Sequence, residues 1–230
     1  LLYCDINPLN NLDITSNINL IELGCSENQL TNLDVTKNIK LKILYCFNNQ
    51  LTNLDVTNNI ELKELRCWNN QLNNLDISNN IKLELLYCDI NPLNNLDITN
   101  NINLIYITCS NNQLNNLDIS KNIKLTILDC SENQLGDLDV SNNIELKVLR
   151  CYNNQLNNLD VTNNTKLDSL ACYSNQLTRL DITPLIKLAD LNCCNQAEGF
   201  ILYLTTEQKN KFTEEHYCDA ILKENGSISE

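Results

Sequence analysis

Cysteine is the most chemically capable residue type repeated in this chain, because a thiolate can be a nucleophile, a metal ligand or half of a disulfide. The 230-residue sequence contains twelve cysteines. Ten of them recur every 21 residues: Cys4, Cys25, Cys46, Cys67, Cys88, Cys109, Cys130, Cys151, Cys172 and Cys193. A metal site needs thiolates that converge on one point, whereas a fixed period places them in a row. The spacing therefore favours a structural role, with cysteine as a small apolar core residue.

Two further cysteines, Cys194 and Cys218, lie outside this series, and the only histidine, His216, is close to the second. In an oxidising compartment the two thiols could form a disulfide. A zinc site made by Cys194, His216 and Cys218 is the alternative, although it lacks a CxxC spacing. No third residue orients His216 and Cys218 for proton transfer, and no phosphate loop, Ser-His-Asp set or HExxH motif occurs. We therefore expect a protein that is not an enzyme and has no cofactor.

An acidic series has the same period. Aspartates recur from Asp13 to Asp181, each followed two residues later by Thr or Ser. Hydrogen bonds from the backbone or from these hydroxyls could offset the repulsion between neighbouring carboxylates. Calcium is the alternative, because it prefers hard oxygen ligands, but no glycine-rich calcium loop accompanies the series. The candidate calcium ligands are Asp34, Asp55, Asp76, Asp97 and Asp118.

The elements that position these residues follow from the repeat. Written from Leu41, one unit reads LKILYCFNNQLTNLDVTNNIE, and eight full units run from Leu20 to Lys187. The units resemble the leucine-rich repeat family, whose signature is L-x-x-L-x-L-x-x-[NC]-x-L. More narrowly, they are similar to the 21-residue repeats of internalin-like bacterial surface proteins. That resemblance implies a solenoid fold and a role in adhesion or host contact.

Within each unit the residue pattern is that of a strand. Leu44 and Cys46 alternate with Ile43, Tyr45 and Phe47, so neighbouring units should stack as parallel strands about 4.8 Å apart. We expect a mainly β, right-handed leucine-rich-repeat solenoid with a parallel concave sheet and a weaker strand-like run on the convex side. The predicted inward positions are Leu41, Leu44, Cys46, Leu51, Leu54, Val56 and Ile60.

Two asparagine series are predicted to satisfy backbone groups at the bends, because the chain has only 4 glycines and 3 prolines. Ligand capture by these amides is the alternative. The first series is Asn7, Asn28, Asn49, Asn70, Asn91, Asn112, Asn133, Asn154 and Asn175. The second is Asn17, Asn38, Asn59, Asn80, Asn101, Asn122, Asn143 and Asn164.

Aromatic residues mark the surface where the units differ. Eight of the twelve aromatics fall at outward strand positions or just after the strand, and aromatics with Arg on an exposed concave face are typical of a binding hot spot. The densest patch is expected at Tyr45, Phe47, Arg66, Trp68 and Tyr87. The full candidate partner-binding set is Tyr3, Tyr45, Phe47, Arg66, Trp68, Tyr87, Tyr106, Arg150, Tyr152 and Tyr173.

The repeat divides the chain into two predicted parts, a solenoid over residues 1–193 and a C-terminal cap over 194–230. FILYL reads as the cap's strand, and Thr205 with Gln208 as the capping box of a short helix. Residues 1–82 also resemble residues 85–166, which indicates a duplicated block of four units. The first residues lack Met, a signal pattern and a cap, so we expect a trimmed piece of a longer protein.

Net charge and hydrophobicity limit the classes of partner that the chain can bind. A net charge of −13 and a pI of about 4.4 disfavour nucleic acids and anionic membranes, and no apolar run is long enough to insert into a bilayer. We expect a monomeric, extracellular or cell-surface recognition module that binds a protein, with a glycan as the lesser option; a cytoplasmic location also fits. Alternatives are a structural matrix module organised by calcium and the targeting arm of a larger effector.

Overall fold

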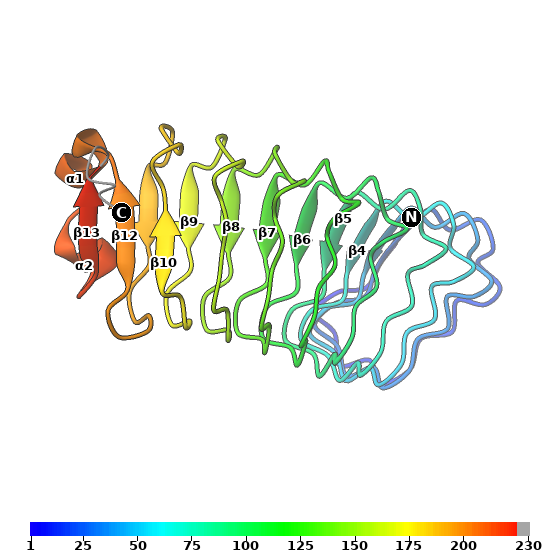
Figure 1. Cartoon of the computed structure of the whole chain (residues 1–230). Coiled ribbons are helices and arrows are strands. Elements are labelled where there is room, and N and C mark those ends of the chain that lie inside the picture. The colour runs from blue at the N-terminus through cyan, green and yellow to red at the C-terminus, as the bar shows by residue number, and fades with distance from the viewer. Residues whose placement is uncertain (225–230) are drawn as a thin grey trace.

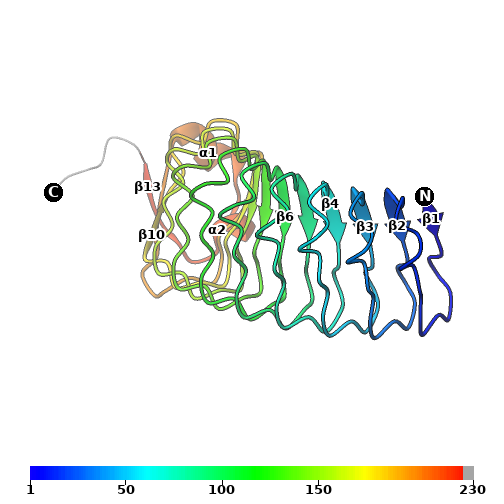
Figure 2. The ribbon, with the colours of Figure 1, turned by 90° about the vertical axis from the view of Figure 1, so that its right-hand side faces the viewer.

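The chain folds into an elongated right-handed solenoid (Figure 1), and the computed structural model describes residues 1–224. Ten short parallel strands line its concave face, in the order β1 to β9 followed by β11. They are β1 (Leu2–Tyr3), β2 (Glu22–Gly24), β3 (Ile43–Tyr45), β4 (Glu64–Arg66), β5 (Leu85–Tyr87), β6 (Tyr106–Thr108), β7 (Ile127–Asp129), β8 (Val148–Arg150), β9 (Ser169–Ala171) and β11 (Asp190–Asn192). Figure 2 shows the successive coils side by side.

The strands pair in register, one unit against the next. Leu44 of β3 lies opposite Leu65 of β4, for example, and Tyr45 lies opposite Arg66. The middle residue of each three-residue strand is buried, while its neighbours face outward, as the alternating pattern predicts. Equivalent residues therefore form straight rows along the solenoid, at the strand spacing of about 4.8 Å.

The periodic cysteines are core residues. Those from Cys25 to Cys193 are buried, and Cys4 at the open first coil is half-buried. All ten are free thiols. Burial raises the pKa of Cys67 and Cys130 well above the ordinary thiol value, so they stay protonated and unreactive. The predicted packing role is confirmed.

One predicted inward position is wrong. Ile60 is 52% exposed, and its counterparts in other coils are exposed to a similar degree. The position follows the turn from Val56 to Asn59 and begins the next turn, from Asn59 to Leu62. It therefore lies at the outer corner of the coil, where Asn59 and Leu62 are the buried residues.

The first asparagine series joins neighbouring coils. The Asn112 amide nitrogen donates to the carbonyls of Cys109 (3.0 Å) and Ser110 (3.1 Å) in its own coil and of Cys88 (3.1 Å) in the preceding coil. Its oxygen accepts from the backbone N–H of Leu93 at 3.1 Å. Each amide thus closes its own bend and ties it to the coil before. These asparagines are structural, as predicted, and from Asn70 onward they are buried.

The bend itself uses the left-handed conformation without glycine. The residue before each series asparagine has φ between 51° and 57°, as at Ile6, Asn48 and Asn111. Asparagine tolerates this region, whereas a β-branched residue is strained there. The second asparagine series is exposed at Asn17 in the first coil and buried from Asn38 to Asn164. Asn59, for example, donates to Val35 O (3.0 Å) and Asn38 O (2.9 Å) of the preceding coil.

The predicted convex strand run is largely absent from residues 1–224. Only β10 (Arg179–Asp181) forms there, and it pairs with β12 (Ile201–Leu204), which in turn pairs with β13 (Ile221–Glu224) of the cap. In the earlier coils, Gln50 N–H reaches the Leu30 carbonyl, but Leu30 N–H bonds to the Asn49 side chain. The side chain takes the place of a backbone acceptor, so no continuous ladder develops.

The C-terminal segment covers the last coil with two short helices, α1 (Thr206–Lys211) and α2 (Glu214–Tyr217). The predicted capping box between Thr205 and Gln208 is present, and the Gln208 amide also donates to Ile182 O at 2.7 Å. Cys194 and Cys218 form a disulfide, so their sulfurs are not available as the thiolate ligands of a zinc site. Because β10 pairs with β12, one sheet crosses the proposed boundary at residue 193.

Replacing Asn112 with Ala should lower the free energy of unfolding by about 3 kcal/mol, because the N–H of Leu93 loses its acceptor and three carbonyls each lose one of two donors. Urea denaturation followed by circular dichroism measures the change. Asn116→Ala is the matched control: it removes an exposed amide from the same coil and should change stability by less than about 0.5 kcal/mol. Equal effects of the two substitutions would contradict the bridging role.

Candidate functional site

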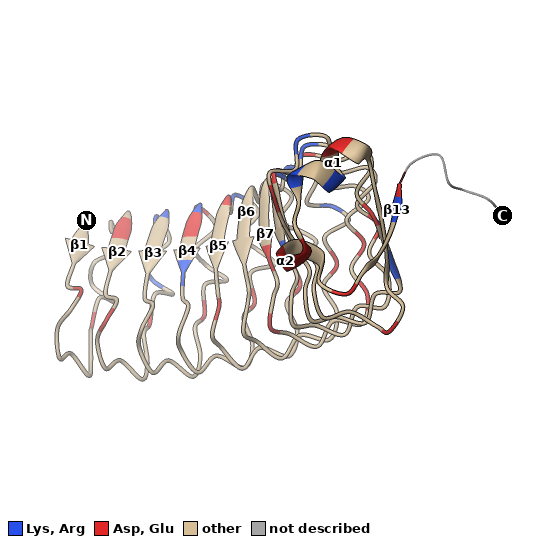
Figure 3. Cartoon of the chain, turned by 90° about the vertical axis from the view of Figure 1, so that its left-hand side faces the viewer, with Lys and Arg blue, Asp and Glu red and all other residues tan. Residues whose placement is uncertain are grey.

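The outward strand residues and the residues after the periodic cysteines form two adjacent rows on the concave face. Tyr3, Tyr45, Arg66, Tyr87 and Arg150 lie in the strand row, because the pairing places these positions in register. The row after the cysteines carries Phe47, Trp68, Tyr152 and Tyr173, while Tyr106 begins β6. Both acidic and basic residues occur on β4, whereas β2 carries only acidic charge (Figure 3).

Arg66 is the centre of the larger aromatic cluster. Its guanidinium carbon lies 4.8 Å from the ring centroid of Tyr45 and 4.7 Å from that of Tyr87, on neighbouring strands on either side. Glu64, two residues earlier in the strand, accepts a hydrogen bond from Arg66 Nε at 2.7 Å. The cation is thus held between two rings and anchored by a carboxylate.

The same cluster continues on both flanks. The rings of Phe47 and Trp68 meet edge to face at an interplanar angle of 84°. Tyr106 stacks on Tyr87 with ring centroids 4.7 Å apart. Together with Tyr45 and Arg66 these residues form the β3–β6 cluster: Tyr45, Phe47, Arg66, Trp68, Tyr87 and Tyr106. All six are half-buried, so each still presents part of its surface to a partner.

The remaining candidates do not join this cluster. Tyr152 and Tyr173 stack with centroids 4.5 Å apart, and Arg150 of the adjacent strand row lies 3.9 Å from Asp129. Tyr3 stands alone at the first coil, where its hydroxyl donates to Glu22 at 2.5 Å. The ten candidates are therefore one cluster of six, the Tyr152–Tyr173 pair, Arg150 beside Asp129 and the isolated Tyr3.

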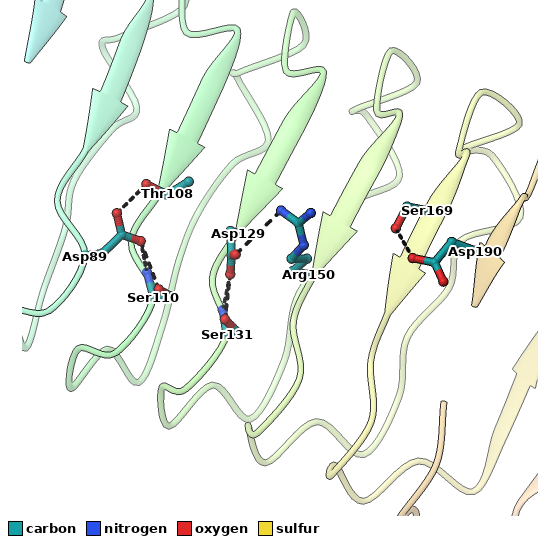
Figure 4. Close-up of polar contacts among 8 residues, drawn as sticks. All are labelled: Asp89, Thr108, Ser110, Asp129, Ser131, Arg150, Ser169 and Asp190. Atoms are coloured by element: carbon teal, nitrogen blue, oxygen red, sulfur yellow. Dashed lines mark hydrogen bonds and ion pairs between the residues drawn. The ribbon is translucent and has the colours of Figure 1, made fainter. Parts of the chain in front are cut away.

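Polar residues occupy the outward positions between Tyr87 of the β3–β6 cluster and Tyr152; their contacts are drawn in Figure 4. Thr108 donates to Asp89, and Ser110 donates to the other oxygen of the same carboxylate through its N–H and its hydroxyl, both at 2.9 Å. Asp129 accepts from the Ser131 hydroxyl at 2.6 Å. Asp89 has no separate signal in the sequence, because the repeat pattern does not record which outward carboxylates become enclosed by the next coil.

Asp89 is electrostatically unusual among these residues. Burial raises its pKa, against hydrogen bonds from Thr108 and Ser110 that lower it. A carboxyl whose folded pKa lies above the unfolded value of about 3.9 reduces stability as the pH rises from the unfolded through the folded pKa. Asp89 therefore opposes folding at neutral pH, whereas an asparagine could accept from Ser110 without a charge.

Asp89→Asn should raise the melting temperature relative to the unmodified chain at about pH 7, with the difference vanishing below about pH 3, where the carboxyl is protonated in both states. Thermal melts across this range measure it. Asp97→Asn is the control of opposite sign, because hydrogen bonds from the Thr99 side chain and backbone lower the pKa of Asp97. The idea fails if the two substitutions show the same pH trend.

The periodic aspartates are occupied by local hydrogen bonds. In one coil, Asp55 Oδ1 accepts from the backbone N–H of Thr57 at 3.0 Å and from its hydroxyl at 2.6 Å. The same pair of bonds recurs at Asp34 and Asp97. Within residues 1–224 no group of three potential metal-ligating side chains converges. Side-chain turns thus provide a structural reason for this series.

Calcium should accordingly leave the melting temperature within about 1 °C of its value in chelator, since an ion that binds only the folded state would raise it. Differential scanning calorimetry in millimolar calcium and in excess chelator makes the comparison, with magnesium as the charge-matched control. A large rise with calcium alone would restore the calcium-organised matrix module as the better hypothesis.

No family model and no curated protein matches the sequence. Solved structures do match. The functional domain of InlJ from Listeria monocytogenes, which includes a cysteine ladder, is 29% identical with a TM-score of 0.58 and covers 89% of this chain. The leucine-rich repeat protein LIC12759 of Leptospira interrogans gives 22% identity, a TM-score of 0.78 and 96% coverage. The internalin InlF of L. monocytogenes gives 24%, 0.70 and 92%.

The fold and these neighbours define the chain as a leucine-rich repeat solenoid built from 21-residue units, with internalins among its structural neighbours. It spans 63%, 59% and 64% of the InlJ, LIC12759 and InlF structures. None of the helices in the described part of the chain has the length and apolar character needed to cross a membrane.

Proposed function

We propose that this solenoid is a non-catalytic recognition module whose β3–β6 cluster binds a protein partner. The fold supports a protein-interaction role in general, because solenoids of this kind use their extended concave surfaces for binding. The observation that carries the specific proposal is the position of Arg66 between the rings of Tyr45 and Tyr87. Tyr, Trp and Arg are the residue types that dominate binding hot spots.

The side chains of the β3–β6 cluster are already held in fixed conformations, and this favours tight binding of a partner. Arg66 is held by Glu64 and by two rings, and Trp68 is held edge to face by Phe47. Side chains that are already fixed lose little rotamer entropy when a partner binds, so more of the contact energy appears as affinity. Half-buried rings on a rigid sheet can take up apolar side chains, and the exposed part of Arg66 can bond to a carboxylate or a carbonyl.

The proposed location is the cell surface or the extracellular space, with adhesion or host contact as the role. The Cys194–Cys218 disulfide supports an oxidising compartment, since such bonds persist there and are rare in the cytosol. The division into a binding solenoid over residues 1–193 and a cap over 194–230 belongs to the same proposal. The cap shields the last coil from solvent, as solenoids require.

Replacing Tyr45 and Trp68 together with Ala should abolish capture of the partner, because it opens the Arg66 sandwich and removes the largest ring. The immobilised chain would be exposed to solubilised surface proteins and the retained proteins quantified by mass spectrometry. Loss of two such contacts corresponds to at least about a hundredfold weaker binding.

Tyr203→Ala is the matched control, because it removes a half-buried aromatic from β12 of the cap sheet and should leave capture unchanged. Periodate oxidation of the ligand fraction separates a glycan determinant from a protein one. Retention of the same partners by a folded Tyr45→Ala/Trp68→Ala chain would refute the proposed face.

A further inference from the structure

A row of exposed isoleucines runs along the edge of the solenoid where each coil turns into its strand. The repeat pattern predicts burial at the Ile60 position, yet each member of this isoleucine ridge is 51–56% exposed. The ridge comprises Ile18, Ile39, Ile60, Ile81, Ile102, Ile123 and Ile144. At about 4.8 Å per coil the seven side chains span about 29 Å. An apolar strip of this length on a chain of charge −13 is characteristic of an interface.

The row of residues next to the ridge indicates which kind of partner surface fits it. The residue after each isoleucine is polar or charged. Two pairs of adjacent coils are joined there by the exposed ion pairs Lys82–Glu61 and Lys166–Glu145. Along the chain this flanking row reads Asn19, Lys40, Glu61, Lys82, Asn103, Lys124 and Glu145, and it continues at Lys166, which follows Thr165 in the next coil. This flanking row has a net positive charge although the whole chain is acidic. Lysines and glutamates both occur along it.

We propose that the ridge is the interface of a homodimer in which two copies pack antiparallel, related by a two-fold axis that crosses the ridge between Ile81 and Ile102. In an isologous contact each row faces itself in reverse. Ile81 then meets the partner's Ile102, and Ile39 meets the partner's Ile144. This proposal is the alternative to the monomer expected from the sequence.

Charge complementarity selects that register. With the axis between Ile81 and Ile102, Lys40 faces the partner's Glu145 and Glu61 faces the partner's Lys124. Lys82 and Asn103 face each other, as do Asn19 and Lys166. No like charges meet in the flanking row, and each of these contacts occurs twice by symmetry.

The two adjacent registers are disfavoured by the same row. A shift by one coil toward the C-terminus brings Lys40 opposite Lys166 and Glu61 opposite Glu145. The opposite shift brings Lys40 opposite Lys124 and sets Lys82 against itself. Like-charge pairs of this kind suppress the wrong partner geometry.

In the proposed register, the two rows beyond these contain one pair of like charges. Two residues before each isoleucine, Lys37 faces the partner's Asn142 and Asn58 faces the partner's Lys121. Three residues after the isoleucines, Lys42 faces the partner's Lys147, but both are exposed at the rim, where water and salt screen the repulsion.

A hollow beside the ridge makes the proposed contact surface uneven, so that partner side chains can enter it. Ile105, Ile123 and Ile144 contribute to its lining together with polar residues of the same two coils. In the proposed register, the partner's Ile60 and Ile39 face Ile123 and Ile144 at this hollow. Because the axis runs from the concave to the convex side, both concave faces of the dimer point the same way. The proposal is independent of which partner the β3–β6 cluster binds.

Sedimentation equilibrium tests the interface. The chain should associate to a dimer with a Kd of about 10 µM or below, and Ile81→Asp/Ile102→Asp should weaken it at least about a hundredfold. Ile90→Asp is the matched control: Ile90 is 49% exposed at the opposite edge of the coil, in a left-handed conformation that Asp tolerates. Circular dichroism checks that all three chains keep their fold.

A charge exchange tests the register. Lys40→Glu should weaken dimerisation by about tenfold, because it places a glutamate opposite the partner's Glu145. Combining it with Glu145→Lys should restore the wild-type constant within about threefold. The two residues lie five coils apart in one chain, about 24 Å, so only a contact between copies can couple them.

Several results would overturn the proposal. These are a monomer at concentrations up to about 0.5 mM, a dimer insensitive to Ile81→Asp/Ile102→Asp, and additive charge effects without restoration. A dimer that loses affinity equally with Ile90→Asp would place the interface elsewhere.

Discussion

The amide group of the first-series asparagine closes the bend of each coil and joins that coil to the one before it. It donates to three backbone carbonyls and accepts one N–H, and the groups it joins belong to two successive coils, as Asn112 shows. Without this amide the backbone N–H of Leu93 would have no acceptor, and three carbonyls would each lose one of two donors. Because the same side chain fixes both the turn and the stacking, the chain can bend every 21 residues with almost no glycine or proline. In the last coil Gln196 takes over, donating to Cys172 O at 2.8 Å and accepting from Leu177 N at 3.1 Å.

That constraint explains why the outer residues can vary. The leucines, cysteines and asparagines hold the coil, so the strand row and the row after the cysteines are free to carry Tyr, Arg, Trp or Ser. The fixed backbone then brings side chains of adjacent strands to the strand spacing, which suits the stacking of Tyr87 on Tyr106 and of Tyr152 on Tyr173. Each coil thus contributes its own variable side chains to the binding surface.

Much of this could be predicted from the sequence, because residues that recur with a strict period occupy the same place in every coil. The buried cysteines and the structural asparagines followed from it, whereas the capping box of α1 followed from the spacing of Thr205 and Gln208 outside the repeat. The exposure of Ile60 did not, because hydrophobicity alone does not tell which side of a two-turn corner a side chain takes. Nor did the enclosure of the Asp89 carboxylate, which depends on how Thr108 and Ser110 of the next coil bond to it. Periodicity assigns a residue to a row, whereas contacts between rows depend on side-chain geometry.

The uniform seam between coils has an evolutionary consequence. Every unit offers its successor the same set of donors, acceptors and apolar side chains, so a unit can be gained or lost by unequal recombination without leaving a mismatched join. The likeness of residues 1–82 to 85–166 is the trace expected of such an event. Changes in unit number would leave the stability of each join almost untouched while altering the molecule's reach and the order of its surface residues. The number of coils thereby becomes a heritable trait open to selection in its own right.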